Sequence, residues 1–380
     1  MKIALVGPTY PFRGGIAHYT TLLVQQLRRR HEVRFYSYRK QYPAWLFPGS
    51  TAPDPSAQIL QEECERTIEP LNPLTWWQTG RQLLAERPDL LLLQWWTPFW
   101  LPLHLTLSLM ARRANIPIIY LCHQLVEPDS SPLEWLTARP ALALAQGLIL
   151  VTEAEYQQAQ RAFPHLALRK GHHPLYDSFP AHGLSRAEAR AVLGIAPEVP
   201  LLLFFGFVRR YKGLPILLDA LAQTDPALHL LIAGEFWEDA ESYQAQIARL
   251  GLTDRVIIHN RYIPNEAVEA YFRAADLLVL PYLSGSQSGV SMLALHHKLP
   301  IITTSVGGLA ETVQHGQTGL IVPPGDRDAL AAALQRFFRE DLGPTLQTGM
   351  ANVQERLSWD GLVQIIEELW CEITGHDAVA

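Results

Sequence analysis

The stretch PYLSGSQSGVSMLALHHKLPIITTSVGGLAE, residues 281–311, follows an apolar run and contains two successive strand, loop and helix patterns. The run at 276–280 predicts a buried strand, and a loop of serines, glycines and one glutamine follows at 284–289. Residues 290–298 have helical spacing, and the next strand is predicted at 300–304. This βα alternation is typical of a parallel sheet covered by helices.

The loop at 284–289 is suited to an oxyanion. A helix N-terminus offers free backbone N–H groups and the positive end of its dipole, and Ser286 and Ser288 add hydroxyls. The pair Gly307-Gly308, after the second strand, allows another backbone turn to approach a ligand closely. Both loops would end at the carboxyl edge of the sheet. The stretch therefore predicts a phosphate site, and the alternative is that its small residues only form tight turns.

Composition restricts the class of protein. A chain of 380 residues suits two domains, and a hydrophobic content of 48% indicates a globular protein. The net charge of −6 gives no general attraction to nucleic acid. Three widely spaced cysteines form no disulfide framework, and no signal-peptide pattern precedes the first strand, so we expect a cytoplasmic protein. The apolar region 90–110 is interrupted by Gln and Pro residues, which favours a buried strand and helix over a membrane span.

The strand and helix patterns alternate twice along the chain, which predicts an α/β protein with two doubly wound domains facing an interdomain cleft. We place the first domain at 1–180 and the second at 181–355, with a linker at 172–182. The helix in 356–380 is expected to pack back on the first domain. The proline-rich segment 38–73 is interpreted as an excursion with at most one short helix.

Two features of the first domain are candidates for a site. Gly14-Gly15 follows the first strand and opens a helix, although neither GxGxxG nor a P-loop motif occurs. His123 directly follows the strand at 117–122, at the carboxyl edge of the sheet. An imidazole there can orient a sugar hydroxyl or move a proton, and a purely structural histidine is the alternative.

The second domain opens with FFGFVRRYKG, residues 204–213, which places cations directly after a strand. Arg209 and Lys212 supply the point charges that a diphosphate needs, or they are solvated loop cations. Asp326-Arg327-Asp328 has the spacing of a metal motif, but a helix follows it, so we interpret it as a helix cap. His296 and His297 diverge by about 100° on a helix. No metal site is predicted.

Taken together, these residues resemble the retaining nucleotide-sugar glycosyltransferases of family 4, which have the two-Rossmann architecture called GT-B. The resemblance implies a nucleoside-diphosphate-sugar donor and no metal or other cofactor. It implies that Lys212 and Arg209 neutralise the leaving diphosphate, that Gly15 offers backbone contact, and that His123 contacts the donor sugar or the acceptor. The further nucleotide-sugar contacts that it implies are Gly14, Gly206, Ser286, Gln287, Ser288, Gly289, Val290 and Glu311.

The chain departs from that family at one point. Family members usually carry two glutamates eight positions apart in this loop region. Counting back from Pro300 gives Gly285 and Leu293, and counting from Gly289 gives Ser286 and Ala294, so neither alignment supplies a glutamate. Gln287 and the loop serines would then offer neutral hydrogen bonds. The usual arginine position, five before the lysine, holds Phe207, so Arg209 or its neighbour Arg210 would take that role.

The predicted function is a hexosyltransferase that moves a sugar to a glycan, lipid-linked or small-molecule acceptor in cell-surface polysaccharide biosynthesis. Peripheral membrane contact would use the aromatic pairs at 76–77, 95–96 or 99–100, although such runs are more often core. The missing glutamates motivate an alternative, a catalytically silent sugar- or nucleotide-binding subunit. A GT-B epimerase or phosphorylase is a third reading.

Overall fold

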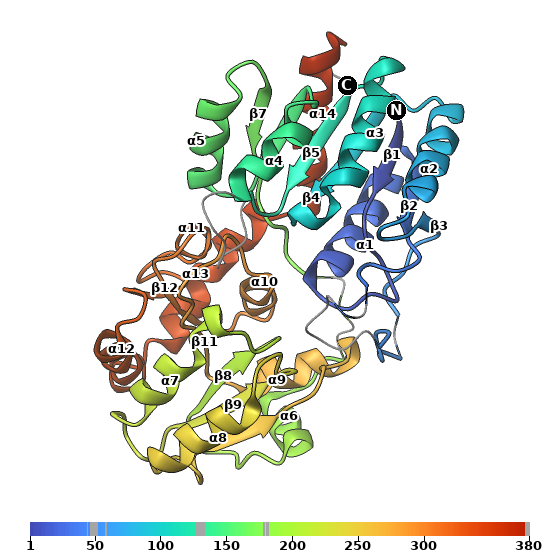
Figure 1. Ribbon diagram of the computed structural model, residues 1–380. Coiled ribbons are helices and arrows are strands. Elements are labelled where there is room, and N and C mark those ends of the chain that lie inside the picture. Colours follow the sequence, from blue (N-terminus) through green and yellow to red (C-terminus); the bar gives the residue numbers. More distant parts are fainter. Residues whose placement is uncertain are drawn as a thin grey trace. The chain divides into compact units, whose positions relative to one another are not determined.

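The computed structural model describes residues 1–43, 45, 52–57, 59–125, 134–177, 179 and 182–376, and the chain forms two compact units (Figure 1). The first unit contains Met1–Asp54, Ile59–Pro174 and Ser358–Ala380, and the second contains Pro55–Gln58 and Leu175–Leu357. The division therefore falls six residues before the predicted position 180. Each unit has its own parallel sheet with helices, which confirms the predicted fold class.

The first unit is built on a seven-stranded sheet with the order β3-β2-β1-β4-β5-β6-β7. Every pairing is parallel, and Ile3 of β1 lies between Val33 of β2 and Leu90 of β4. All six residues of β4 are buried, as expected for a parallel strand covered on both faces. The strands are β1 (Lys2–Val6), β2 (Glu32–Tyr38), β3 (Glu65–Ile68), β4 (Leu90–Trp95), β5 (Ile118–Cys122), β6 (Gly147–Leu150) and β7 (Ala167–Lys170).

The final helix is part of the first unit. Glu367 of this helix accepts a hydrogen bond from His31 Nε2 at 2.7 Å and forms an ion pair with Arg30 at 2.8 Å. Gly147 leaves room for the helix, because a Cβ there would lie 2.9 Å from Leu369. The helices of this unit are α1 (Gly15–Arg28), α2 (Pro73–Ala85), η1 (Pro98–Trp100), α3 (Leu101–Arg113), α4 (Glu134–Leu142), α5 (Glu153–Ala162) and α14 (Trp359–Thr374).

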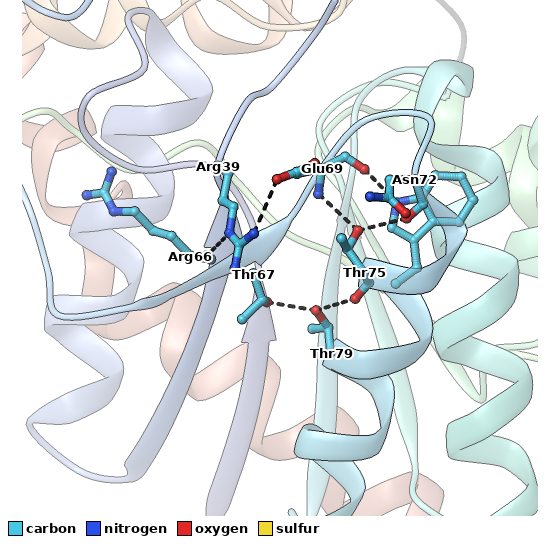
Figure 2. Close-up of polar contacts among 8 residues, drawn as sticks. Arg39, Arg66, Thr67, Glu69, Asn72, Thr75 and Thr79 are labelled. Atoms are coloured by element: carbon cyan, nitrogen blue, oxygen red, sulfur yellow. Dashed lines mark hydrogen bonds and ion pairs between the residues drawn. The ribbon is translucent and has the colours of Figure 1, made fainter.

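The excursion at 38–73 contains a strand, β3, that the sequence pattern did not predict. β3 pairs in parallel with β2, yet only Ile68 of its four residues is buried. Polar contacts of β3 and the segments beside it, drawn in Figure 2, help to hold this strand in place. Arg39 donates to the Arg66 carbonyl at 2.9 Å and to Glu69 at 3.2 Å, and Thr79 Oγ1 of α2 donates to Thr67 Oγ1 at 2.7 Å.

The second unit has a six-stranded parallel sheet with the order β10-β9-β8-β11-β12-β13. Its strands are β8 (Leu201–Phe205), β9 (His229–Ala233), β10 (Val256–His259), β11 (Leu277–Leu280), β12 (Ile301–Thr304) and β13 (Gly319–Val322). Its helices are α6 (Arg186–Leu193), η2 (Arg210–Lys212), α7 (Leu214–Leu221), α8 (Ala240–Arg249), η3 (Asn265–Ala267), α9 (Val268–Ala274), α10 (Gly289–His296), α11 (Leu309–Thr312), α12 (Arg327–Arg339) and α13 (Gly343–Arg356).

Both sheets reverse their strand order beside the first strand of the unit. β1 lies between β2 and β4, and β8 lies between β9 and β11. Ligands of open parallel sheets bind outside the carboxyl ends of the strands at this switch point. The loops after β1 and β8 are therefore the positions at which each unit is expected to bind a ligand.

Most of the aromatic residues considered for membrane contact lie in the core of the first unit. Trp76, Trp95, Trp96 and Trp100 are buried, whereas Trp77 on α2 is 49% exposed. Within the described residues, no helix is both long enough and apolar enough to cross a membrane. Only Trp77 of these tryptophans offers substantial surface.

Replacing His104 with leucine is expected to stabilise the protein. This α3 side chain is buried beside the rings of Trp95 and Tyr120, and neither ring nitrogen has a partner among the described residues. Burial lowers the pKa of His104 to about 3. Removing an unsatisfied buried polar group is worth about 1–3 kcal/mol. Below about pH 6.5 the unfolded histidine binds a proton and the buried one does not. The stability advantage of the leucine variant should therefore grow as the pH falls from 6.5 to 3, by at most about 1.4 kcal/mol per pH unit.

Urea unfolding at pH 7.5 and pH 5 measures this gain. The exposed His165 provides the control, since replacing it with leucine should change the unfolding free energy by no more than about 0.5 kcal/mol. A variant at His104 that is less stable than the wild type at both pH values would contradict the expectation.

Candidate functional site

The loop after β8 holds a buried cation in the second unit. Lys212 ends η2 and is 7% exposed. Its Nζ lies 3.2 Å from the position that a Cβ would take at Gly206, and 5.7 Å from the centre of the Tyr282 ring. Among the described residues it forms no ion pair with a carboxylate. Burial, and secondarily the charge of Arg209, lowers the pKa of Lys212 to about 7. A bound anion would complement this ammonium group.

Arg209 rather than Arg210 accompanies Lys212. The Arg209 guanidinium lies over the rings of Tyr211 at 5.0 Å and Trp237 at 5.6 Å, and its charge acts on Lys212. Arg210 is exposed, and its backbone N–H donates to Glu238. Of the two arginines, Arg209 is therefore the one whose placement favours a role beside Lys212.

The N-terminus of α10 meets the same loop. α10 begins at Gly289, and the side chain of its N-cap residue, Ser288, makes no capping hydrogen bond. Val290, in the first turn of α10, lies 3.4 Å from the position of a Gly206 Cβ. Gly206 itself has a φ of 91°, a backbone conformation that glycine adopts without strain. Gly206, Lys212 and the first turn of α10 thus converge on one small region at the carboxyl edge of the sheet.

The two loops of the stretch 281–311 lie side by side. Gly308 N–H donates to the Ser286 carbonyl, and a Cβ at Gly307 would lie 1.9 Å from the Gly285 carbonyl oxygen. Gln287 braces the pair, because its Oε1 accepts a hydrogen bond from Thr312 Oγ1 at 3.2 Å. Glycine is required at this approach by lack of space as well as by its φ of 44° at Gly307.

Glu311 lies in the first turn of α11 and is exposed. Its backbone N–H donates to the Gly308 carbonyl at 3.2 Å. Its backbone therefore belongs to the turn formed by the glycine pair, while its carboxylate is accessible to solvent. The described part of this loop region contains no glutamate at the two positions that the family resemblance leads one to expect.

In the first unit, Gly14 and Gly15 form the N-terminus of α1. Gly14 has φ 107° and ψ 169°, and the first turn of α1 holds no acidic residue. Gly15 is exposed. The backbone N–H groups of this turn and the helix dipole therefore favour an anion or a polar oxygen there.

His123 lies at the carboxyl end of β5, as predicted, and a buried glutamine fixes its ring. His123 Nε2 donates to Gln94 Oε1 at 2.8 Å, and the same oxygen accepts from Thr20 Oγ1 at 3.0 Å. The ring also meets the edge of Tyr19, with centroids 4.6 Å apart. Burial, and secondarily the neighbouring His173, lowers the pKa of His123 to about 3. His123 is therefore neutral near pH 7 and suited to hydrogen bonding rather than to carrying a charge.

Gln94 and Tyr282 were missed in the sequence. Gln94 is the polar residue within the apolar run LLLLQW of β4, and it is fully buried. A polar residue in such a run is the sequence signal that could have identified it, since a buried amide needs hydrogen-bond partners. Tyr282 lies two residues after the end of β11, and its hydroxyl lies 3.5 Å from Ser288 Oγ. Burial raises the pKa of Tyr282, which therefore stays neutral beside Lys212.

The structure supports the helix-cap interpretation of Asp326. Its Oδ1 accepts a hydrogen bond from Ala329 N–H at 2.9 Å, at the N-terminus of α12. The rings of His296 and His297 meet edge to face with centroids 4.9 Å apart. The described part of the chain holds no group of three or more His, Cys, Asp or Glu side chains arranged to bind a metal.

Comparisons with known proteins agree with this geometry. Residues 14–166 match the family model of the glycosyl transferase 4-like domain, and residues 199–340 match that of glycosyl transferases group 1. The chain is 30% identical over 302 residues to a D-inositol 3-phosphate glycosyltransferase of Streptomyces bingchenggensis, covering 72% of this chain and 65% of that one. The matched region spans 42 to 65% of the length of three such relatives.

Solved structures share the fold over nearly the whole chain. Sucrose-phosphate synthase from Thermosynechococcus elongatus superposes with a TM-score of 0.72 at 21% identity, covering 99% of this chain and 100% of that one. HepE of Anabaena, solved in complex with UDP, has a TM-score of 0.74 at 20% identity, covering 98% and 100%. At these identities the likeness shows the architecture.

Proposed function

We propose that this chain, which belongs to the group 1 glycosyltransferases and has the GT-B fold, transfers a sugar from a nucleoside diphosphate to an acceptor with retention of anomeric configuration. The second unit would hold the nucleoside diphosphate, and the first unit would contact the transferred sugar or the acceptor. A glycan or lipid-linked acceptor of cell-surface polysaccharide synthesis is the proposed acceptor class.

The observation that carries the proposal is the buried Lys212 beside Gly206 and the first turn of α10. Cleavage of the bond between sugar and phosphate places negative charge on the diphosphate. A fixed ammonium group and uncapped helix N–H groups stabilise that charge without reorganisation. Arg209, held over two aromatic rings, supplies a second positive charge. These groups supply the electrostatic stabilisation for which other enzymes use a divalent cation, so we propose that no metal is required.

The first unit would contribute hydrogen bonds rather than charge. Neutral His123 is oriented by Gln94, to which its Nε2 donates, so its other ring nitrogen, Nδ1, is an acceptor suited to a sugar hydroxyl. The turn at Gly14-Gly15 has no side chain, so a ligand can approach its backbone closely. Both features orient uncharged sugar oxygens, consistent with a hexose as the transferred group.

A catalytically silent binding subunit is the second candidate. It is favoured by the loop at 284–289, where Gln287 is engaged with Thr312 and no carboxylate is available. Neutral side chains can still bind sugar hydroxyls, so the loop chemistry permits either function. A GT-B epimerase or phosphorylase would use the same diphosphate or phosphate contacts.

Binding and turnover distinguish these functions. Isothermal titration with UDP, GDP and ADP tests the nucleotide site, and transfer is then measured with the matching nucleotide sugars and glycan or lipid extracts. We expect at least one nucleotide to bind and its sugar to be transferred with the configuration retained, as read by NMR of the product. Binding without turnover would favour the silent subunit, and no binding of any nucleotide at millimolar concentration would reject the proposal.

A further inference from the structure

The outer side of α2 carries an apolar surface, which we call the outer patch and define as Leu71, Leu74 and Trp77. These side chains are 63%, 71% and 49% exposed. The residues of α2 that pack on the unit are Thr75, Trp76, Thr79, Gly80 and Leu83. At about 100° per residue, Leu74 and Trp77 lie on the opposite side of the helix from that buried face. The pattern of an ordinary surface helix places polar residues there.

The backbone presents this patch rigidly. Leu71 has a φ of 59°, a left-handed conformation that is unfavourable for leucine and easily adopted by glycine or asparagine. The turn around it is fixed by polar contacts (Figure 2): Glu69 N–H donates to Thr75 Oγ1 at 3.2 Å, which donates to the Asn72 carbonyl at 2.8 Å. The exposed leucines therefore extend from an ordered turn at the start of α2.

Two arginines lie close to the outer patch. The Arg81 guanidinium lies over the Trp77 ring at 5.0 Å. Arg39 is bound to Glu69, two residues before Leu71, and the exposed Lys40 follows Arg39. Exposed leucine and tryptophan side chains with adjacent arginine and lysine are the combination that binds the interface of an anionic bilayer. The high exposure of Leu71 and Leu74 shows that they project outward, which favours a broad soft surface over a peptide in a groove.

The position of the outer patch relates it to the proposed reaction. α2 follows β3, so the turn at Leu71 lies at the carboxyl edge of the first sheet. The Gly14-Gly15 turn and His123 lie at the same edge of that sheet. We propose that the outer patch docks the first unit on an anionic phospholipid surface. The inference rests on the proposed function, because it makes the acceptor a lipid-linked one.

Vesicle flotation of the full chain tests the proposal. We use vesicles of phosphatidylcholine alone and of phosphatidylcholine with about 30% phosphatidylglycerol, and vary the salt concentration. The wild type should float with the anionic vesicles, more weakly as salt rises. The variant Leu71→Asn/Leu74→Gln/Trp77→Gln should bind at least tenfold more weakly, and Arg81→Gln should weaken binding less. Val192→Gln, which removes a 70% exposed valine from α6, is the matched control and should bind like the wild type.

Three results would overturn the proposal. The first is no flotation of the wild type, and the second is equal flotation of the triple variant. The third is light scattering that shows a dimer of the wild type and a monomer of the triple variant, which would assign the patch to a second copy of the chain. Nucleotide binding by the second unit should be unchanged in the triple variant, which checks its folding. Flotation without sugar transfer would support membrane docking by the outer patch and reject the proposed transfer reaction. Transfer to a soluble acceptor without flotation would support the reaction and reject membrane docking.

Discussion

Replacing Lys212 with methionine is expected to stabilise the free protein and, at the same time, to weaken its binding of a nucleoside diphosphate. Methionine has a similar length and volume and needs no compensating charge. Because burial lowers the pKa of Lys212 from 10.5 to about 7, the folded protein pays for keeping this group charged near neutral pH. We expect a gain of several kcal/mol in unfolding free energy at pH 7, at most about 5 kcal/mol from this pKa difference at about 1.4 kcal/mol per pKa unit, or about 2–4 °C in Tm per kcal/mol.

The pH dependence of that gain has a defined sign. Between about pH 7 and 10.5 the unfolded lysine binds a proton that the folded one does not, so wild-type stability rises with pH across this window. The advantage of methionine should therefore be largest at pH 7 or below and should vanish near pH 10.5. Thermal unfolding of both proteins across this range measures the difference.

Ligand binding should change in the opposite direction. Loss of a charge-assisted contact costs roughly 1.5–3 kcal/mol, which is about 10-fold to 150-fold in Kd and in donor-dependent rate. A bound diphosphate raises the pKa of Lys212, so the wild type should take up a proton on binding above about pH 7, and its affinity should fall as pH rises. Titration calorimetry in buffers of different ionisation enthalpy detects this proton.

The matched control is Arg210→Met, two residues earlier on the same loop. Arg210 is exposed, so its loss should change neither stability by more than about 0.5 kcal/mol nor the proton uptake on binding. If Lys212→Met and Arg210→Met bind the nucleotide equally well, Lys212 is not part of the site.

The sequence predicted those features that depend on short segments. Apolar strand runs, the glycines after them and the serine loop before α10 are local patterns, so the two sheets and the two adjacent loops of 281–311 could be read without a structure. β3 could not be, because its charged residues are ordered by pairing with β2 and by side chains of α2 rather than by their own hydrophobicity.

The site required contacts between distant residues. Arg209 and Lys212 were predicted as loop cations, but nothing in FVRRYKG reveals that Lys212 is buried or that Arg209 stacks on Trp237, 28 positions away. Gln94 contacts His123 and Thr20 across 29 and 74 positions. The burial that lowers the pKa of a lysine or histidine is produced by the tertiary fold, so residue type alone identifies the candidate but leaves its charge state undetermined.

Replacing Gly307 with alanine is expected to disable the loop that begins the stretch 281–311, with little effect on the rest of the fold. The added Cβ would lie 1.9 Å from the Gly285 carbonyl oxygen and 3.1 Å from that of Ser286, so one of the two loops must move. The loop that contains Gly285 and Ser286 leads into the first turn of α10, whose N–H groups are proposed to bind the diphosphate. We expect nucleotide affinity to fall at least about tenfold, and unfolding free energy to fall by about 1–3 kcal/mol.

Gly316→Ala separates steric conflict from backbone strain. Gly316 also has a positive φ, 75°, but a Cβ there meets nothing within 4 Å. The unfolding free energy of Gly316→Ala should therefore fall only by the roughly 1–2 kcal/mol that a left-handed alanine costs, and this variant should bind nucleotide like the wild type. Hydrogen exchange of the amides at 285–290 should accelerate in Gly307→Ala alone. Equal nucleotide affinity in the two variants would show that the contact between the loops does not position the ligand. The proposed phosphate site would then rest on Lys212 and its neighbours after β8, and not on the stretch 281–311.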